Sequence, residues 1–174
     1  MATTYNNIAI EMKHFNQIRQ NIPRINEMHH DTLNILIEMG ALQVSTLLEL
    51  AIANVGDLDV ISANEHDLSD GSEVKMATAR IHRYGTAYGA IISNTKNKTG
   101  TVRAQVLEPI TGKFYYFVIP VDAHSKVTGA SNIEVPFELD GSPRRDYKPR
   151  SLPNWWNYEV ESFEVMCNTP NLGH

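Results

Sequence analysis

The spacing of the apolar residues changes near Asp57, and this change constrains the fold more than any other feature. Before it, apolar side chains recur every three or four positions, as at Met12, Phe15 and Ile18, which indicates helices with one buried face. After it, they occur in short, partly alternating runs separated by Gly, Asn and Asp, as is typical of strands and turns. Helices followed by a mixed sheet predict an α/β or α+β domain.

The 174 residues are expected to form a single domain with three consecutive parts. Residues 1–55 are predicted to be two or three helices, one of which ends at Gly40. Residues 57–120 should form the central sheet, and residues 121–174 an irregular basic arm with a last apolar segment. The predicted strands are 58–62, 73–81, 87–93, 101–107 and 114–119, the last two paired antiparallel, with hairpin turns at 97–100 and 111–113.

The composition is that of an ordinary globular protein, with 42% hydrophobic and 20% charged residues. No apolar run approaches the roughly 20 residues that span a bilayer, and the first residues do not resemble a secretion signal. We therefore expect no membrane association. The single cysteine, Cys167, cannot form an intrachain disulfide, and a cytoplasmic location is expected.

The strongest local signal is the segment from Asp67 to Lys75, in which Asp70-Gly71 predicts a tight turn. Because side chains alternate along a strand, Glu73 and Lys75 should share one face, with Val74 directed into the core. Asp67 should lie near Glu73 on the other side of the turn. One edge of the sheet would then carry two carboxylates and an ammonium group.

Two carboxylates this close repel each other unless a cation lies between them. Asp67 and Glu73 would therefore hold Mg²⁺, which prefers oxygen ligands, and the Val74 carbonyl is a candidate third ligand. Such a metal lowers the pKa of an attacking water and stabilises charge on a phosphate. Lys75 would orient the water and stabilise the developing negative charge. These are the requirements of phosphodiester hydrolysis.

The arrangement Asp67…Glu73-Val74-Lys75 resembles the D…E-x-K signature of the PD-(D/E)XK, or restriction-endonuclease-like, superfamily. The resemblance covers residues 46–107, and its tight spacing is similar to that of a mismatch-repair nicking endonuclease and several short Type II restriction enzymes. It implies a restriction-endonuclease-like fold, with the Asp and the E-x-K on adjacent strands joined by a hairpin. It also implies an acidic residue on the preceding helix that supports the metal site, and Glu49 is the matching candidate.

Alternatives stay open within this motif. Asp70 in the turn, or Asp57 or Asp59 ahead of the first predicted strand, could be the metal ligand in place of Asp67. Glu49 could instead close a capping box with Thr46. The whole motif could also be an exposed hairpin whose charges form a solvated ladder, each pair contributing less than about 1 kcal/mol.

The net charge of −5 argues against nucleic acid as a partner, although basic residues cluster locally. Contacts to DNA are predicted for the basic side chains after the motif, near the 97–100 turn and in the C-terminal arm. These are Arg80, Arg83, Lys96, Lys98, Arg103, Arg144, Arg145, Lys148 and Arg150. Trp155 and Trp156 are expected to make core or dimer contacts rather than to stack on bases.

The sequence thus predicts a Mg²⁺-dependent endonuclease that cuts double-stranded DNA, of the Type II restriction class. A homodimer is expected, because a palindromic site presents two equivalent strands to two equivalent active sites. A repair or Holliday-junction nuclease of the same fold is one alternative, and a non-enzymatic phage or accessory protein is the other. His66 is expected to face away from Asp67, on the opposite side of a strand.

Overall fold

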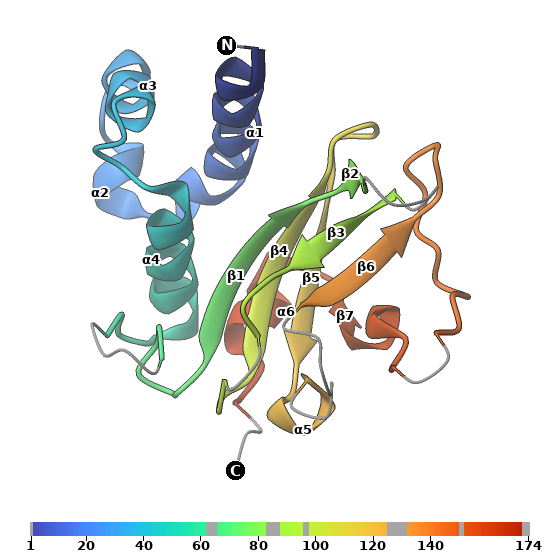
Figure 1. The fold of residues 1–174 in the computed structure, drawn as a ribbon. Coiled ribbons are helices and arrows are strands. Elements are labelled where there is room, and N and C mark those ends of the chain that lie inside the picture. Colours follow the sequence, from blue (N-terminus) through green and yellow to red (C-terminus); the bar gives the residue numbers. More distant parts are fainter. Residues whose placement is uncertain are drawn as a thin grey trace.

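The computed structural model describes residues 2–61, 66–82, 88–95, 98–124, 132–149 and 152–171. The first helices gather on one side of the sheets (Figure 1), and three short helices come later in the described part of the chain. The helices are α1 (Ala2–Ile18), η1 (Arg19–Asn21), α2 (Pro23–Asn26), α3 (His30–Glu38), α4 (Val44–Gly56), α5 (Val121–His124), η2 (Trp155–Tyr158) and α6 (Phe163–Asn168).

The N-terminal helices bury the faces that the apolar spacing predicts. Phe15 and Ile18 of α1 are fully buried, as are Leu48 and Ile52 of α4. Gly40 follows the end of α3 with a φ of +72°, the left-handed conformation that glycine adopts without strain. The first 55 residues are therefore helical with a stop at Gly40, as predicted, but they form the four α-helices α1 to α4 rather than two or three.

The strands form two sheets in the described part of the chain. The larger has the order β1-β4-β5-β7, in which β1 runs parallel to β4 and the other pairs are antiparallel. The smaller is antiparallel, with the order β2-β3-β6. The strands are β1 (Glu73–Thr78), β2 (Arg80–Ile81), β3 (Tyr88–Ile92), β4 (Val102–Glu108), β5 (Lys113–Ile119), β6 (Ile133–Phe137) and β7 (Glu159–Val160).

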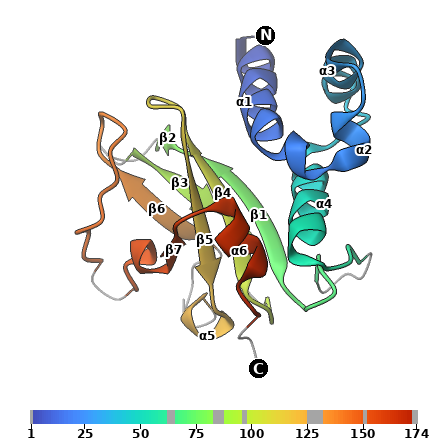
Figure 2. The same cartoon turned by 180° about the vertical axis from the view of Figure 1, so that it is seen from behind.

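Two apolar cores hold these layers together. One lies between the two sheets and contains Ala104, Phe117 and Phe137. The other joins the N-terminal helices to the opposite face of the larger sheet and to α6. Figure 2 shows from behind how α6 lies over this face. Every residue of β4 is buried, because the strand has both cores on its faces and a strand on each edge. Helices combined with a mixed and an antiparallel sheet confirm the α+β prediction.

The strands differ from the sequence prediction in four places. The single strand predicted over 73–81 is broken at Ala79 into β1 and β2, which belong to different sheets. The predicted strand 58–62 is reduced, within the described residues, to one isolated bridge between Val60 and Leu68. The Asp70-Gly71 turn exists, but β1 pairs with β4 and not with the segment that carries Asp67. β3 and β4 do not form the hairpin predicted around 97–100, because they belong to different sheets.

The C-terminal arm is more regular than predicted. Its residues include β6, which forms one edge of the smaller sheet, and α6, which lies against the larger sheet. Trp155 and Trp156 are buried, and the Trp156 indole donates a hydrogen bond to the Pro136 carbonyl at 2.9 Å. The expectation that these two side chains serve the core is confirmed. Among the described residues, no helix combines the length and the apolarity needed to cross a bilayer.

Candidate active site

The residues from Asp67 to Ser72 form a tight turn that leads into β1. The Gly71 N–H donates to the Leu68 carbonyl at 2.9 Å, and Gly71 has a φ of +85°. Asp70 Oδ1 accepts from the Ser72 N–H at 3.0 Å and from its hydroxyl at 2.6 Å, the local bonding that favours Asp in turns. The turn therefore delivers the chain directly to Glu73, the first residue of β1.

Asp67 is fastened to the start of β1 by its side chain. Its Oδ2 accepts the Val74 N–H at 2.7 Å, and its backbone N–H donates to the Ser72 carbonyl at 3.2 Å. The Asp67 carboxylate also raises the pKa of the Glu73 carboxyl, which places the two groups in one electrostatic site. The expected proximity of Asp67 to Glu73 is thus present, through a turn and a side-chain hydrogen bond rather than a regular hairpin.

Glu73 is a buried acid with an incomplete set of partners. Its side chain is 1% exposed, and Oε2 lies 3.1 Å from Lys98 Nζ. The other oxygen, Oε1, accepts from no N–H or O–H group among the described residues, and His66 Nδ1 lies 4.0 Å from it. Burial raises the pKa of this carboxyl, while Lys98 opposes the rise and Asp67 adds to it. The Asp67 carboxylate is close enough to the Glu73 side chain for a hydrogen bond between the two acids, which also raises the pKa of Glu73.

Glu49 reaches the same site from α4, which packs against β1 (Figure 1). Its pKa is raised to about 7, first by burial and then by the charges of Asp67 and Glu73, and Lys75 partly opposes this shift. The capping-box alternative for Glu49 is wrong, because α4 begins at Val44, two residues before Thr46. The predicted acid on the preceding helix therefore does lie close to the motif.

Val74 and Lys75 complete the motif on β1. Val74 is buried in the core that faces the helices. Lys75 is half-buried and, by strand alternation, shares a face with Glu73. Four ionisable side chains from three elements thus interact electrostatically: Glu49 from α4, Asp67 from the turn, and Glu73 and Lys75 from β1.

The oxygen donors of this site suit a hard cation such as Mg²⁺. Lys98 balances the charge of the buried Glu73, but Glu73 Oε1 accepts from no N–H or O–H group among the described residues, so a cation bound there would complete the coordination of this oxygen. Only the Asp67 and Glu73 carboxylates would serve as side-chain ligands. The described residues contain no group of three His, Cys, Asp or Glu side chains with metal-binding geometry. Asp67 and Glu73 would hold the ion, with backbone or water oxygens completing its shell.

The other aspartates considered as ligands lie elsewhere. Asp57 caps the end of α4 in a left-handed conformation, with a φ of +54°, and is exposed. Asp59 is exposed as well, and its N–H donates to the Ser69 hydroxyl at 3.0 Å. Asp70 pairs with Arg103 at 2.6 Å, so its charge is already neutralised. Asp67 is the aspartate that the structure places beside Glu73.

Arg103 requires a correction, because it is a buried structural residue and not a DNA contact. Its side chain is 1% exposed. Besides Asp70, its guanidinium donates to Ser72 Oγ at 3.1 Å and to the carbonyls of Met166 at 2.5 Å and Thr169 at 2.7 Å. A guanidinium with these partners inside the protein cannot reach a phosphate.

The remaining basic residues divide by their surroundings. Arg80 and Lys148 are exposed. Arg144 pairs with Glu138 at 3.3 Å and lies over the Tyr147 ring. Arg145 pairs with Glu159 at 2.9 Å and lies over the Trp156 ring. The DNA contacts predicted for Arg83, Lys96 and Arg150 lie outside the described residues.

Sequence reasoning missed two contacts of the site. His66 was expected to face away from the motif, yet its Nδ1 is directed at Glu73. Lys98 was assigned to phosphate binding, yet its ammonium lies on the Glu73 carboxylate. Both contacts depend on the tertiary structure. Lys98 lies 25 positions after Glu73, and no local sequence pattern joins them.

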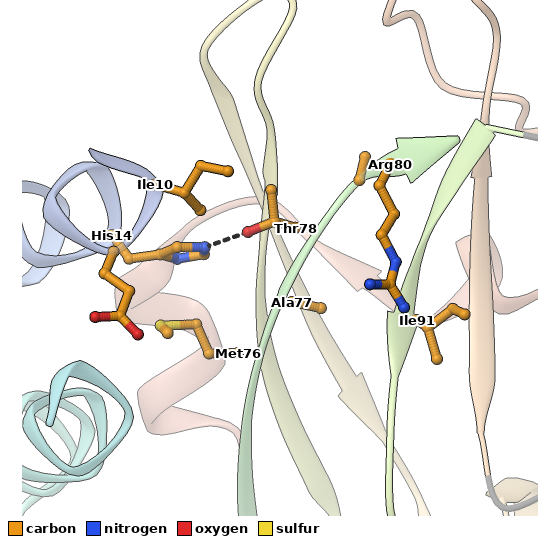
Figure 3. A pocket seen from close by; sticks show the side chains of 9 residues that line it. Ile10, His14, Met76, Ala77, Thr78, Arg80 and Ile91 are labelled. Atoms are coloured by element: carbon orange, nitrogen blue, oxygen red, sulfur yellow. Dashed lines mark hydrogen bonds between the residues drawn. The ribbon is translucent and has the colours of Figure 1, made fainter. Parts of the chain in front are cut away.

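A cavity of about 410 Å³ lies at the other end of β1, between α1 and β3 (Figure 3). There the buried His14 contacts Thr78 Oγ1 through Nε2 at 2.9 Å and accepts from the Gln105 amide through Nδ1 at 3.0 Å. Burial lowers the pKa of His14 to about 4, so the ring is neutral near neutral pH. The cavity contains none of the motif residues and has no part in the candidate site.

Comparison of the chain with protein-family models, with curated proteins and with solved structures gave no match, so the candidate site rests on its own geometry.

Proposed function

We propose that this protein is a Mg²⁺-dependent endonuclease that hydrolyses phosphodiester bonds in double-stranded DNA. The observation that carries the proposal is the convergence of Glu49, Asp67, Glu73 and Lys75 on one site that holds a buried, partly unpaired carboxylate. Acidic side chains with shifted pKa values, grouped beside a lysine, are a common property of active sites. An ion-pair ladder on an exposed hairpin would not bury Glu73.

The roles of the side chains follow from their charges and positions. Asp67 and Glu73 would hold the ion, which when bound makes water a stronger nucleophile and offsets charge on the phosphate. Lys75, on the same face as Glu73, would orient the water and neutralise charge on the phosphate. Glu49, whose pKa is raised to about 7 while the charges of Asp67 and Glu73 lack a metal ion, lies beside these two ligands and would support the metal site from α4.

We also propose that these elements form a restriction-endonuclease-like core, supported by the order of α4, the turn and the E-x-K strand in a mixed sheet. One detail differs from that family's arrangement, because Asp67 precedes β1 in a turn rather than on a paired strand. A homodimer and a palindromic recognition site, as in Type II restriction enzymes, belong to this proposal.

The test is cleavage of supercoiled plasmids and linear duplexes of mixed sequence in the presence of Mg²⁺ or Mn²⁺. We expect the wild type to give discrete fragments, the Glu73→Gln variant to give none, and the matched surface variant Glu138→Gln to behave as wild type. Light scattering would report the oligomeric state. Intact DNA in every wild-type reaction, including branched and mismatched duplexes, would refute nuclease activity and leave a non-enzymatic role.

Cleavage confined to branched or mismatched duplexes would retain the active site but assign it to repair or junction resolution. Discrete fragments from an unbranched plasmid would instead favour the restriction class, because they require sequence preference.

A further inference from the structure

Lys98 contacts the same carboxylate that is proposed to hold the metal ion. Its Nζ lies 3.1 Å from Glu73 Oε2, and its side chain is 27% exposed while that of Glu73 is 1% exposed. Lys98 comes from the segment between β3 and β4, outside the E-x-K motif. The structure therefore places a second lysine directly on the proposed metal ligand.

The backbone next to Lys98 is fixed against the turn that carries the site. Gly100 lies so close to this turn that a Cβ at its position would be 1.7 Å from the Gly71 carbonyl oxygen. The Gly100 carbonyl contacts His124 Nε2 at 2.9 Å, and the Glu73 N–H donates to the Thr101 carbonyl at 2.8 Å. The base of the Lys98 side chain is thus held beside Glu73, while its four-carbon chain can rotate.

An ammonium group and a divalent cation compete for one carboxylate. A metal–oxygen bond of roughly 2.0–2.1 Å to Glu73 brings a double positive charge close to Lys98, and like charges at that separation repel strongly. The side chain must then move toward negative charge. A nucleic acid bound at the metal would supply such a charge in its backbone phosphate.

We propose that Lys98 is an exchangeable counter-ion: it neutralises Glu73 in the metal-free protein, yields this carboxylate to the divalent cation, and then binds the phosphate that is cut. The inference rests on the proposed function. Lys98 would be a catalytic residue in addition to Lys75, because it contacts the reacting phosphate as a point charge.

The test compares Lys98→Gln and Lys98→Met with the wild type in two assays on the full chain. Ca²⁺ binding without DNA is measured by titration calorimetry in a mildly alkaline buffer, and DNA cleavage is measured with Mg²⁺. We expect both variants to bind Ca²⁺ about tenfold more tightly, because the competing charge is gone. We expect both to cleave DNA at least about tenfold more slowly, because the phosphate contact is lost.

Opposite changes in the two assays separate this role from a structural one, since a damaged site would lose both affinity and activity. Lys98→Arg retains the charge and should keep the wild-type Ca²⁺ affinity. Lys113→Met, which removes an exposed lysine at the start of β5, should change neither assay.

Two outcomes would overturn the inference. If the wild type binds Ca²⁺ and cleaves DNA, and folded Lys98→Gln and Lys98→Met bind Ca²⁺ equally or less tightly, Lys98 does not compete for Glu73 and the proposed function stands. If neither the wild type nor these variants bind Ca²⁺ or cleave DNA, the proposed function fails and the role of Lys98 fails with it.

Discussion

Removal of the Arg103 guanidinium is predicted to destabilise the fold more than removal of any other basic group described. In Arg103→Met the Asp70 carboxylate, which is 19% exposed, loses its counter-charge, and the Met166 and Thr169 carbonyls lose their donor. A methionine fills much of the same volume, so the change is mainly electrostatic. The ion pair joins the turn before β1 to the segment after α6, and both ends should loosen together.

The expected cost can be worked from this bonding. Breaking a buried ion pair by removing one partner costs about 3–5 kcal/mol, because the other charge stays behind. For a domain of this length, that corresponds to a fall in Tm of roughly 6–20 °C. Urea denaturation followed by circular dichroism would measure the free energy, with Arg80→Met, an exposed arginine, expected within about 0.5 kcal/mol of wild type.

The pH dependence gives an independent check on the same pair. Burial tends to raise the pKa of Asp70, but hydrogen bonds from Ser72 and Arg103, together with the Arg103 charge, lower it below its usual 3.8. Because the folded pKa is depressed, this stabilisation is present at neutral pH and is lost as the pH falls through the folded value. In Arg103→Met the free energy of unfolding should therefore fall less steeply as the pH is lowered into this acid range. If Arg103→Met lowers the free energy of unfolding by less than about 1 kcal/mol and leaves its dependence on acid pH unchanged, the structural role assigned to Arg103 is refuted.

Three further predictions concern single sites. Gly100→Ala should cost about 3 kcal/mol, because the new Cβ meets the Gly71 backbone. Gly112→Ala has nothing within 4 Å of its Cβ, so only the strain of its φ of +72° remains and it should cost less in the same urea assay. The carbon NMR signal of the Glu49 carboxyl should titrate near pH 7, and the titration midpoint should move to lower pH in Asp67→Asn. Because the folded pKa of Glu49 is raised, the wild type should lose stability relative to Glu49→Gln as the pH rises from about 4.5 to 7. Cys167 is buried, with its pKa raised to about 12, so a thiol reagent should label it only after unfolding; rapid labelling of the native protein would contradict this burial.

Local patterns predicted the elements better than they predicted how those elements pair. The period of the apolar residues is set by each helix or strand itself, which is why α1, α4 and the β4–β5 hairpin follow the prediction. The parallel pairing of β1 with β4 joins residues 29 positions apart, Glu73 with Val102, and no turn residue encodes it. β6 was missed because Gly, Pro and Asn around it give the sequence the composition of a loop.

The candidate site shows the same division between local and distant information. The spacing of Glu73 and Lys75 fixes their common face, and the Asp70-Gly71 turn brings Asp67 near them. The charge of Arg103 suggested a phosphate contact, but an arginine on a strand carries no sign of what covers it. Its burial follows from α6, which returns to the sheet from more than 60 residues away.

Two ion pairs flank the turn before β1, and they differ in how completely their atoms are hydrogen-bonded. In the pair of Asp70 and Arg103, the guanidinium has four acceptors and the carboxylate has donors on both oxygens, so the charges are locked in place. In the pair of Glu73 and Lys98, the carboxylate is more deeply buried, yet Glu73 Oε1 and the facing His66 Nδ1 lack partners among the described residues. Stability alone favours giving every buried charged group a full set of hydrogen bonds, and the chain does this for Arg103 and for Asp70, which lies three residues before Glu73. An acid left unsatisfied there is better explained by a ligand that completes it, which is why we place the chemistry at Glu73 and the support at Arg103.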